Sequence, residues 1–161
     1  MINPIVIAID AMGGDNSPTK VIEGVSIHLR NSVNVNYKIF GKEDLIKPLL
    51  KKYSIPNERF NLIHTDKVVE GEDSALTAAK RGKNTSLWLA VESLKNDEAH
   101  AMVSAGNTGA LFLISKLNLK MIENIDKPAL SALWPSKKGI AKLGSELFDH
   151  IRRRFSLRHL Q

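Results

Sequence analysis

The sequence predicts an α/β fold, a doubly wound and mostly parallel sheet with helices on both faces. Short apolar runs typical of buried strands alternate along the chain with segments of helical periodicity. The first run is apolar through residues 5–9 and ends in Asp10, as expected of a parallel strand that is covered on both faces. Polar, glycine-bearing loops follow two of these runs, at 10–17 and 104–109. Open parallel sheets bind their ligands in loops of this kind.

Each element has a local signature. Strands are expected over 4–10, 35–40, 60–64, 101–103 and 130–134, and helices over 18–30, 44–53, 86–94 and 111–119. A loop with a short helix is expected over 70–76, and a basic turn over 80–86. The 35–40 strand alternates apolar with polar residues, which places it nearer the edge of the sheet. The expected helix caps are Ser17 with Pro18 at the first helical position, Asp44, and Thr85 or Ser86.

Length and composition indicate one soluble domain. The chain has 161 residues, of which 43% are hydrophobic and 25% are charged. The sequence contains no cysteine, which excludes disulfides, thiolate metal sites and a cysteine nucleophile, and is compatible with a reducing cytoplasm. No stretch approaches the roughly 18–20 apolar residues that cross a bilayer. We therefore expect a cytoplasmic protein.

The net charge of +6 is unevenly distributed. Up to Pro135 there are 16 Lys and Arg against 15 Asp and Glu, whereas from Ser136 onward there are 7 against 2. A basic chain often binds nucleic acid, but such binding needs a basic surface on the folded body. The body is nearly neutral, so no nucleic-acid partner is expected.

Three polar segments, at 10–17, 72–86 and 104–109, fall between strands and helices. Because the carboxyl ends of parallel strands share one edge of the sheet, these segments are expected to converge on one crevice. The glycines of the third segment let the backbone approach a ligand, and the N–H groups at the start of the next helix favour an anion. The alternative is a turn that uses Gly and Asn for its geometry alone.

Several sharper motifs are absent from the sequence. It contains no phosphate loop of the form G-x-x-x-x-G-K-[ST], no G-x-G-x-x-G dinucleotide turn and no G-x-S-x-G nucleophile elbow. The five histidines lack metal-ligand spacing. The cations Lys80, Arg81 and Lys83 have two interpretations, a solvated surface or the capture of a phosphate beside Gly82.

Two motifs resemble a known family. Ile9-Asp10-Ala11-Met12-Gly13-Gly14-Asp15 and Val103-Ser104-Ala105-Gly106-Asn107-Thr108-Gly109-Ala110 resemble the signatures of the bacterial phosphate acyltransferases, the PlsX family. Residues 73–86 and 125–130 resemble two further family segments, and the likeness covers residues 4–139. It implies a fold similar to the isocitrate and isopropylmalate dehydrogenases, of which this chain would hold the amino-terminal part only.

The resemblance also implies an activity. Family members move a fatty acyl group from acyl carrier protein to inorganic phosphate. The product, acyl phosphate, feeds phospholipid biosynthesis through a membrane glycerol-3-phosphate acyltransferase. Family members are homodimers, and the resemblance implies no metal and no organic cofactor.

Thioester chemistry suits these residue types. The thiol is a good leaving group and phosphate is already an oxyanion, so the protein must supply orientation, an anion cradle and an oxyanion hole. By resemblance, the candidate catalytic residues are Asn107, Lys80 and Arg81. The candidate residues for binding phosphate or acyl phosphate are Asp10, Gly13, Gly14, Asp15, Ser86, Ser104, Gly106, Thr108 and Gly109. A basic rim near Lys83 would steer an acidic carrier protein.

The carboxyl-terminal residues depart from the family. Family chains are about twice as long, so we expect an amino-terminal family part at 1–139 and a basic, out-of-family tail at 140–161. A helical face of Leu143, Leu147, Phe148 and Ile151 lies beside three arginines in the sequence. The tail either lies on an anionic membrane, which gives a peripheral location, or covers apolar surface or frays. For the whole chain, the alternative to an active enzyme is a truncated remnant that at most binds phosphate or a partner protein.

Overall fold

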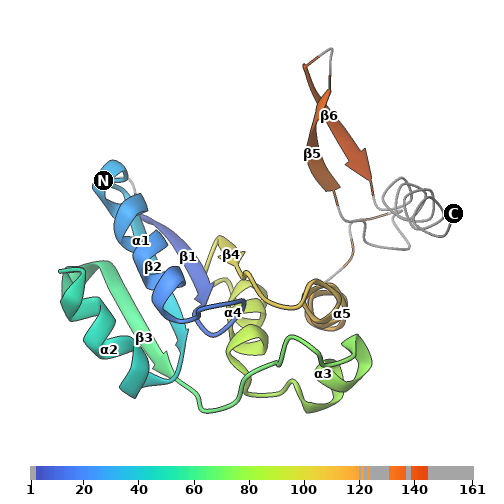
Figure 1. Ribbon diagram of the computed structural model, residues 1–161, viewed down its shortest axis with the longest axis horizontal. Helices are drawn as coiled ribbons and strands as arrows, with labels where there is room; N and C mark the ends of the chain where they lie inside the picture. Colours follow the sequence, from blue (N-terminus) through green and yellow to red (C-terminus); the bar gives the residue numbers. More distant parts are fainter. Residues whose placement is uncertain (1–2, 120, 122, 124–130, 137–138, 145–161) are drawn as a thin grey trace, which may run out of the picture. The chain divides into compact units, whose positions relative to one another are not determined.

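The computed structural model describes residues 3–119, 121, 123, 131–136 and 139–144. The chain divides into two compact units, Met1–Lys120 and Met121–Gln161, which are described separately. The first unit contains a parallel sheet with its helices, and the second contains a hairpin (Figure 1).

The sheet of the first unit has four parallel strands. They are β1 (Ile5–Asp10), β2 (Val35–Gly41), β3 (Phe60–His64) and β4 (Ala101–Val103), in the order β3-β2-β1-β4. Each of the three neighbouring pairs is parallel. The chain runs from β1 outward to β2 and β3 and then returns to the other side of β1. The strand order therefore reverses between β1 and β4, where open α/β sheets bind ligands.

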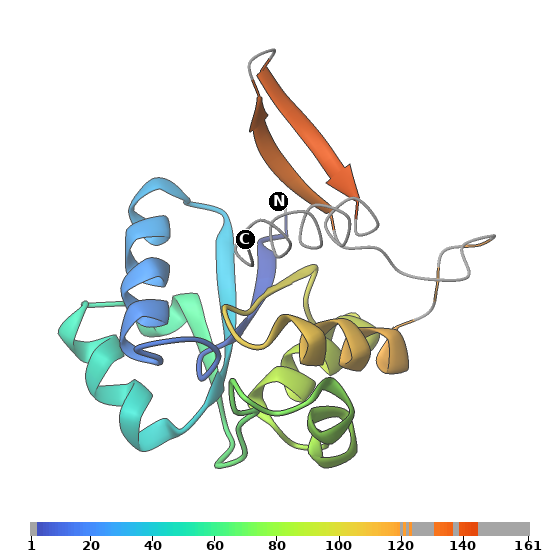
Figure 2. The ribbon, with the colours of Figure 1, turned by 45° about the vertical axis from the view of Figure 1, so that its right-hand side comes forward.

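Helices cover both faces of the sheet. They are α1 (Thr19–Asn31), α2 (Glu43–Lys52), α3 (Ala75–Arg81), α4 (Ser86–Lys95) and α5 (Thr108–Asn118), with a short 3₁₀ turn η1 (Asn57–Arg59) before β3. Figure 2 shows α1 and α2 on one side of the sheet and α3, α4 and α5 on the other. The α/β prediction is confirmed.

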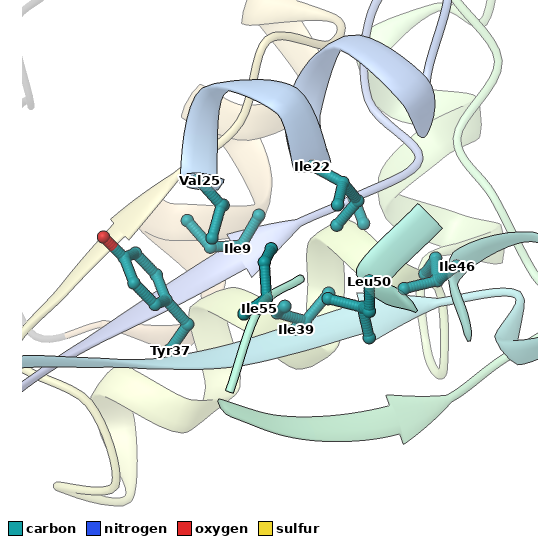
Figure 3. Packing of buried hydrophobic residues seen from close by; sticks show 9 residues of the cluster. Ile9, Ile22, Val25, Tyr37, Ile39, Ile46, Leu50 and Ile55 are labelled. Atoms are coloured by element: carbon teal, nitrogen blue, oxygen red, sulfur yellow. The ribbon is translucent and has the colours of Figure 1, made fainter. Parts of the chain in front are cut away.

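The core between the sheet and α1 and α2 is apolar. Figure 3 shows its side chains converging from β1, β2, α1 and α2. Ile22, Ile39 and Ile46 are fully buried there. Burying one such side chain stabilises the fold by about 1.5–3 kcal/mol relative to leaving it in water.

The opposite face uses the alternate residues of the same strands. Ala8 of β1 and Phe40 of β2 pack against Ala90 of α4. A neighbouring cluster joins α3, α4 and α5 through Ala78, Leu87, Val91, Ala110 and Ile114. Both faces of β1 and β2 are therefore apolar, because side chains alternate across a strand.

The expected edge position of the second strand is wrong. β2 lies inside the sheet, with hydrogen-bonded partners on both sides. Its alternation reflects two polar positions, Asn36 and Lys38, rather than an edge. Lys38 is partly buried beside the sheet and forms an ion pair with Glu98. The long lysine stem covers apolar surface while its ammonium group finds a carboxylate.

Two of the expected helix caps are wrong and one is confirmed. Ser17 does not cap α1, because its hydroxyl donates to the carbonyl of Gly13 at 2.6 Å and Pro18 occupies the cap position. Helix α2 begins at Glu43, so Asp44 lies in its first turn. There its negative charge interacts favourably with the positive end of the helix dipole. Thr85 caps α4 by accepting from the N–H of Trp88 at 3.2 Å.

The second unit contains β5 (Ser131–Ser136) and β6 (Gly139–Gly144), which pair antiparallel. Two residues separate the strands in sequence, a spacing that joins antiparallel neighbours. The strand expected at 130–134 is therefore present over Ser131–Ser136, but it belongs to a separate two-stranded sheet. Leu143 lies in β6, so its expected place on a helical face is wrong, and Leu147, Phe148 and Ile151 lie outside the described residues.

Among the helices that the structure describes, none has the length and apolar character needed to cross a membrane.

Candidate functional site at the β1–β4 junction

The ends of β1 and β4 meet through their side chains. Asp10 closes β1 and is 3% exposed, and Ser104 follows β4 directly. The Ser104 hydroxyl donates to Asp10 Oδ2 at 2.7 Å, and the N–H of Met12 donates to Asp10 Oδ1 at 3.3 Å. Both oxygens of this buried carboxylate thus have donors, as a buried charge requires. The expected convergence of the first and third polar segments is confirmed.

Glycines bring the two loops to backbone distance. A Cβ on Gly13 would lie 2.5 Å from Asp10 Oδ2, 2.7 Å from Ser104 Oγ and 3.0 Å from the nitrogen of Gly106. A Cβ on Gly14 would lie 2.5 Å from the carbonyl oxygen of Ala105, and Gly14 has φ of +94°. Gly13 is therefore required for space, and Gly14 for both space and conformation.

The start of α5 presents two backbone donors. The N–H of Gly106 donates to Ser104 Oγ at 3.1 Å, and that of Ala110 donates to Asn107 Oδ1 at 2.9 Å. The N–H groups of Thr108 and Gly109 have no acceptor within the part of the chain that the structure describes. Both residues are exposed. Free N–H groups in the first helical turn favour an anion there, aided by the helix dipole.

Asn107 links α5 to the segment before α3. Its side-chain nitrogen donates to the carbonyls of Gly71, at 3.0 Å, and Asp73, at 2.8 Å. Its oxygen caps α5. The amide of Asn107 is therefore engaged within the chain, and the structure gives this residue a positioning role. Its expected catalytic role stays a prediction.

Only part of the second polar segment reaches the junction. Gly71 and Asp73 lie against Asn107, and a Cβ on Gly109 would lie 3.4 Å from Cβ of Ala75. Lys80 and Arg81 are exposed in the last turn of α3. Over the described residues, no hydrogen bond or ion pair joins either cation to Asp10 or Ser104.

Two other expected ligands make no hydrogen bond to Asp10 or Ser104 in the described part of the chain. Ser86 is 1% exposed at the start of α4, and its N–H donates to the carbonyl of Lys67 at 3.1 Å. Its hydroxyl is buried without a partner in the described part of the chain. Asp15 is exposed in the loop between β1 and α1. Their assignment to phosphate binding stays a prediction.

A groove of about 420 Å³ begins beside Asp10 and runs between α1 and the strands β1 and β4. At one end it is lined by Asp10, Asp15, Ser17 and Lys20, and at the other by His28 and Tyr37. Apolar side chains line its length: Ile7, Ile9, Val21, Val25 and Val103. The structure therefore places an apolar groove next to the two glycine loops.

A histidine–tyrosine pair forms the far end of the groove. The Tyr37 hydroxyl lies in hydrogen-bond contact with His28 Nδ1, while His28 Nε2 lies 3.0 Å from the hydroxyl of Ser32. Burial raises the pKa of the Tyr37 phenol above its ordinary value, and the nearby Arg59 charge opposes this by a smaller amount.

Comparisons with known proteins show the family of this chain. The model of one protein family, described as "Fatty acid synthesis protein", matches residues 5–144. The chain belongs to this family. The matched region includes both glycine loops, and it runs past residue 139, at which the sequence analysis places the end of the family part.

Curated relatives carry the name phosphate acyltransferase. The protein of that name from Pelagibacter ubique is 56% identical over 137 residues, which are 85% of this chain and 40% of the relative. That from Parvibaculum lavamentivorans is 43% identical over 140 residues, 86% of this chain and 39% of the relative. That from Bradyrhizobium diazoefficiens is 40% identical over 140 residues, which are 86% of this chain and 40% of the relative. The chain spans about two fifths of the length of these curated relatives.

Sequence reasoning missed two features of the site. The contact of Asn107 with the Gly71 and Asp73 carbonyls joins residues more than thirty positions apart, and no pattern in the sequence indicates it. Ser74 caps α3 by accepting from the N–H of Thr77 at 3.1 Å. A serine directly before a short helix was the available signal for this second feature.

Proposed function

We propose that the family part of this chain binds inorganic phosphate at the two glycine loops and transfers an acyl group to it from acyl carrier protein. The observation that carries the proposal is the Ser104–Asp10 contact, at 2.7 Å. It holds the loop after β1 against the loop after β4 at the point where the strand order reverses. The name phosphate acyltransferase, borne by the relatives, supports the reaction class.

The proposed reaction balances without a redox step. A phosphate oxygen attacks the carbonyl carbon of the acyl thioester, so that a C–O bond forms and the C–S bond breaks. The carrier thiolate leaves with the electron pair of the C–S bond and takes up the proton that the attacking hydrogen phosphate loses, relayed by water. The products are acyl phosphate and the free carrier thiol.

Backbone N–H groups at the start of α5 are the main phosphate ligands in the proposal. The N–H groups of Thr108 and Gly109 belong to the first turn of α5 and point out of the N-terminus of the helix, where they would bind phosphate and orient one of its oxygens. In the proposal Asp10 and Ser104 hold the two loops together, and the Asp10 carboxylate makes no direct contact with phosphate, because like charges repel. The N–H of Gly106 is held by Ser104 and supports the loop.

The exposed cations supply charge rather than a fixed contact. Lys80 and Arg81 stand in the last turn of α3, whose first residue lies beside Gly109. In the proposal they act as counter-charges for phosphate, and Lys83 helps to attract the acidic carrier protein. The acyl phosphate is then consumed by a membrane glycerol-3-phosphate acyltransferase, and the enzyme works as a homodimer in the cytoplasm, in contact with the membrane surface.

An assay of acyl phosphate formation tests the proposal. The purified chain is incubated with acyl-[acyl carrier protein] and inorganic phosphate, and acyl phosphate is trapped with hydroxylamine and quantified. We expect phosphate-dependent release of carrier thiol, which is lowered by Arg81→Ala and by Asn107→Ala. Wild-type rates in both variants would overturn the assigned roles.

A second candidate function is phosphate binding without catalysis. The exposed N–H groups of Thr108 and Gly109 favour it, since the start of a helix can bind an anion without any catalytic group. The same assay separates the two functions. Saturable phosphate binding without acyl phosphate formation, in the presence of carrier substrate, indicates the non-catalytic function.

A further inference from the structure

The apolar groove between α1 and the strands β1 and β4 opens at the two glycine loops. Asp10, which ends β1, and Ala105, in the loop after β4, both line it. Ser104 precedes Ala105 and joins the two loops through its hydrogen bond to Asp10. The proposed function brings phosphate and the thioester carbonyl to these loops. One end of the groove therefore lies where the acyl chain of the substrate begins.

Apolar side chains from a helix and two strands form the walls of the groove. Val25 of α1 lies beside Ile9 of β1 (Figure 3), and Val103 of β4 also lines the groove. Val103 is 54% exposed, so an apolar wall faces water there. The groove volume of about 420 Å³ lies within the range of about 300–1,000 Å³ that small-molecule sites occupy. Such sites combine apolar walls with a few polar groups, as this groove does.

The chemistry of the walls selects a hydrocarbon chain as the occupant. A peptide carries an N–H and a C=O group at almost every residue, and each needs a hydrogen-bond partner when it leaves water. The backbone groups of the walls are already bonded within α1 and between β1 and its neighbours. Polar side chains line the groove only at its two ends. A methylene chain needs no such partner and gains free energy with each CH₂ group that it buries.

The histidine–tyrosine pair marks the far limit of the groove. The His28 ring is held on both sides, since Nδ1 contacts the Tyr37 hydroxyl and Nε2 lies 3.0 Å from the hydroxyl of Ser32. Lys20 at the opening and His28 at the far end both lie in α1, and a helix rises about 1.5 Å per residue, so the groove is about 12 Å long. An extended chain with C–C bonds of about 1.5 Å advances about 1.3 Å per carbon, so about ten carbons fit.

We propose that this groove holds the acyl chain of the thioester substrate and that the His28–Tyr37 pair sets the length of chain that it takes. The inference rests on the proposed function, which places the thioester carbonyl at the glycine loops. From there the chain runs between Val25 and Val103, and its methyl end meets His28. Carbons beyond about the tenth pass His28 into water, where they bury no further apolar surface and add no affinity.

Binding of acyl thioesters of increasing length tests the proposal. The probes are S-acyl-N-acetylcysteamine thioesters, and each is titrated into the purified 161-residue chain by calorimetry, without phosphate. We expect the affinity to rise by about two- to fourfold for each added CH₂ group. The rise should stop at about ten carbons, where the chain reaches His28.

The variant Val103→Thr tests the wall of the groove. It keeps the shape of the side chain and replaces one methyl group with a hydroxyl, and the exposure of Val103 lets the free chain fold with this change. A hydroxyl against the hydrocarbon should weaken binding of the longest probe by about fivefold. Val33→Thr is the matched control, since it makes the same substitution at an exposed position outside the groove, and it should bind as the wild type does.

The variant His28→Ala tests the far limit. His28 is exposed, and its loss opens the end of the groove. We expect the affinity to go on rising beyond about ten carbons in this variant. Partial unfolding would weaken binding at every length, so it cannot produce this gain for longer chains.

Three results would overturn the proposal. They are an affinity that does not depend on chain length, a Val103→Thr variant that binds as the wild type does, and a length limit that His28→Ala leaves unchanged. The titrations need neither phosphate nor turnover, so this inference and the proposed function fail separately. Length-independent binding by a chain that still forms acyl phosphate overturns the inference alone. The expected length dependence without acyl phosphate formation supports the groove and overturns the proposed catalysis alone.

Discussion

Gly13 lies at the closest approach of the two loops. Its hydrogen atoms face Asp10, Ser104 and the backbone of Gly106, and a methyl group there would come within 3.0 Å of all three. The hydroxyl-to-carboxylate bond at the junction is therefore possible only with a bare backbone at this position. The role of Gly13 is to permit the contact between the loops rather than to contribute a side chain of its own.

We expect Gly13→Ala to separate the two loops. A displacement of about 1 Å at a site can cost about 100-fold in rate, so phosphate-dependent acyl phosphate formation should fall by about that factor. Steady-state assays of both variants check this, with Gly24→Ala as the control because a methyl group at Gly24 meets nothing within 4 Å. Equal rates for wild type and Gly13→Ala would mean that the junction has no part in the reaction.

Tyr37 makes the free energy of unfolding depend on pH in the alkaline range. Its phenol is 3% exposed, and burial raises its pKa above the ordinary value. The folded pKa is raised, so the stabilisation is fully present below the unfolded pKa of about 10 and is lost as the pH rises through the folded value. Urea unfolding from about pH 8 to about pH 11 should show a smaller alkaline loss of stability in Tyr37→Phe.

The second tyrosine provides the control for this titration. Tyr53 follows α2 and is only partly buried. Tyr53→Phe should keep the alkaline loss of stability seen in the wild type. If Tyr37→Phe and the wild type lose stability in parallel, Tyr37 does not titrate in this way.

At the scale of elements, α5 is fixed at its first residue by one amide. Asn107 caps the helix with its oxygen and, with its nitrogen, holds the two carbonyls that precede α3. Helix α5 is thereby aligned so that its first turn faces the loop after β1. This coupling matters more for the site than the helix propensity of the residues inside α5.

The two functions of Asn107 can be separated by substitution. Asn107→Ala removes the cap and both donor bonds, and should lower the free energy of unfolding by about 1–2 kcal/mol and weaken phosphate binding. Asn107→Asp keeps an oxygen for the cap but loses both donors, so it should recover part of the stability and none of the phosphate affinity. Urea unfolding and phosphate titration calorimetry measure the two effects.

Helix α4 supplies the control for the cap. Thr85→Ala removes a cap of similar strength at a helix that does not contact the junction through Asn107. We expect a comparable loss of stability with wild-type phosphate affinity. If Thr85→Ala lost as much phosphate affinity as Asn107→Ala, the loss of helix stability alone would account for the weaker binding in both variants.

Most elements were predictable from the sequence because their signals are local. The strands at Phe60–His64 and Ala101–Val103 are found over the expected residues. Their apolar runs are short and are bounded by turn residues, so no other secondary structure competes strongly with a strand there. The start of α1 was not predictable, because the Ser17 hydroxyl turns back to Gly13 instead of capping the helix. The partner of the Ser17 hydroxyl depends on the folded conformation of the loop between β1 and α1.

The candidate site was predictable in part, for the same reason. The meeting of Asp10 with Ser104 follows from the parallel sheet, since both residues end adjacent strands. The distance of Lys80 and Arg81 from that contact does not follow from spacing, because it depends on how α3 packs against α5. A cluster of cations near a loop in sequence indicates charge in the region but not a contact.

At the scale of the molecule, the first unit contains a sheet with a reversal of strand order and a site at that reversal. Its site elements all lie within Met1–Lys120. The glycine loops, the start of α5 and the groove beside β1 are therefore present in one compact unit. We expect this unit to bind phosphate at the start of α5.

Phosphate titration followed by ¹⁵N–¹H correlation spectra tests that claim most directly. Inorganic phosphate is added to the labelled chain at constant ionic strength, with chloride as the control anion. We predict saturable shifts of the Thr108 and Gly109 amide signals, with smaller shifts at Gly13 and Gly14 and none in Gly13→Ala. Unchanged Thr108 and Gly109 signals, or saturable shifts confined to residues 80–83, would contradict the account.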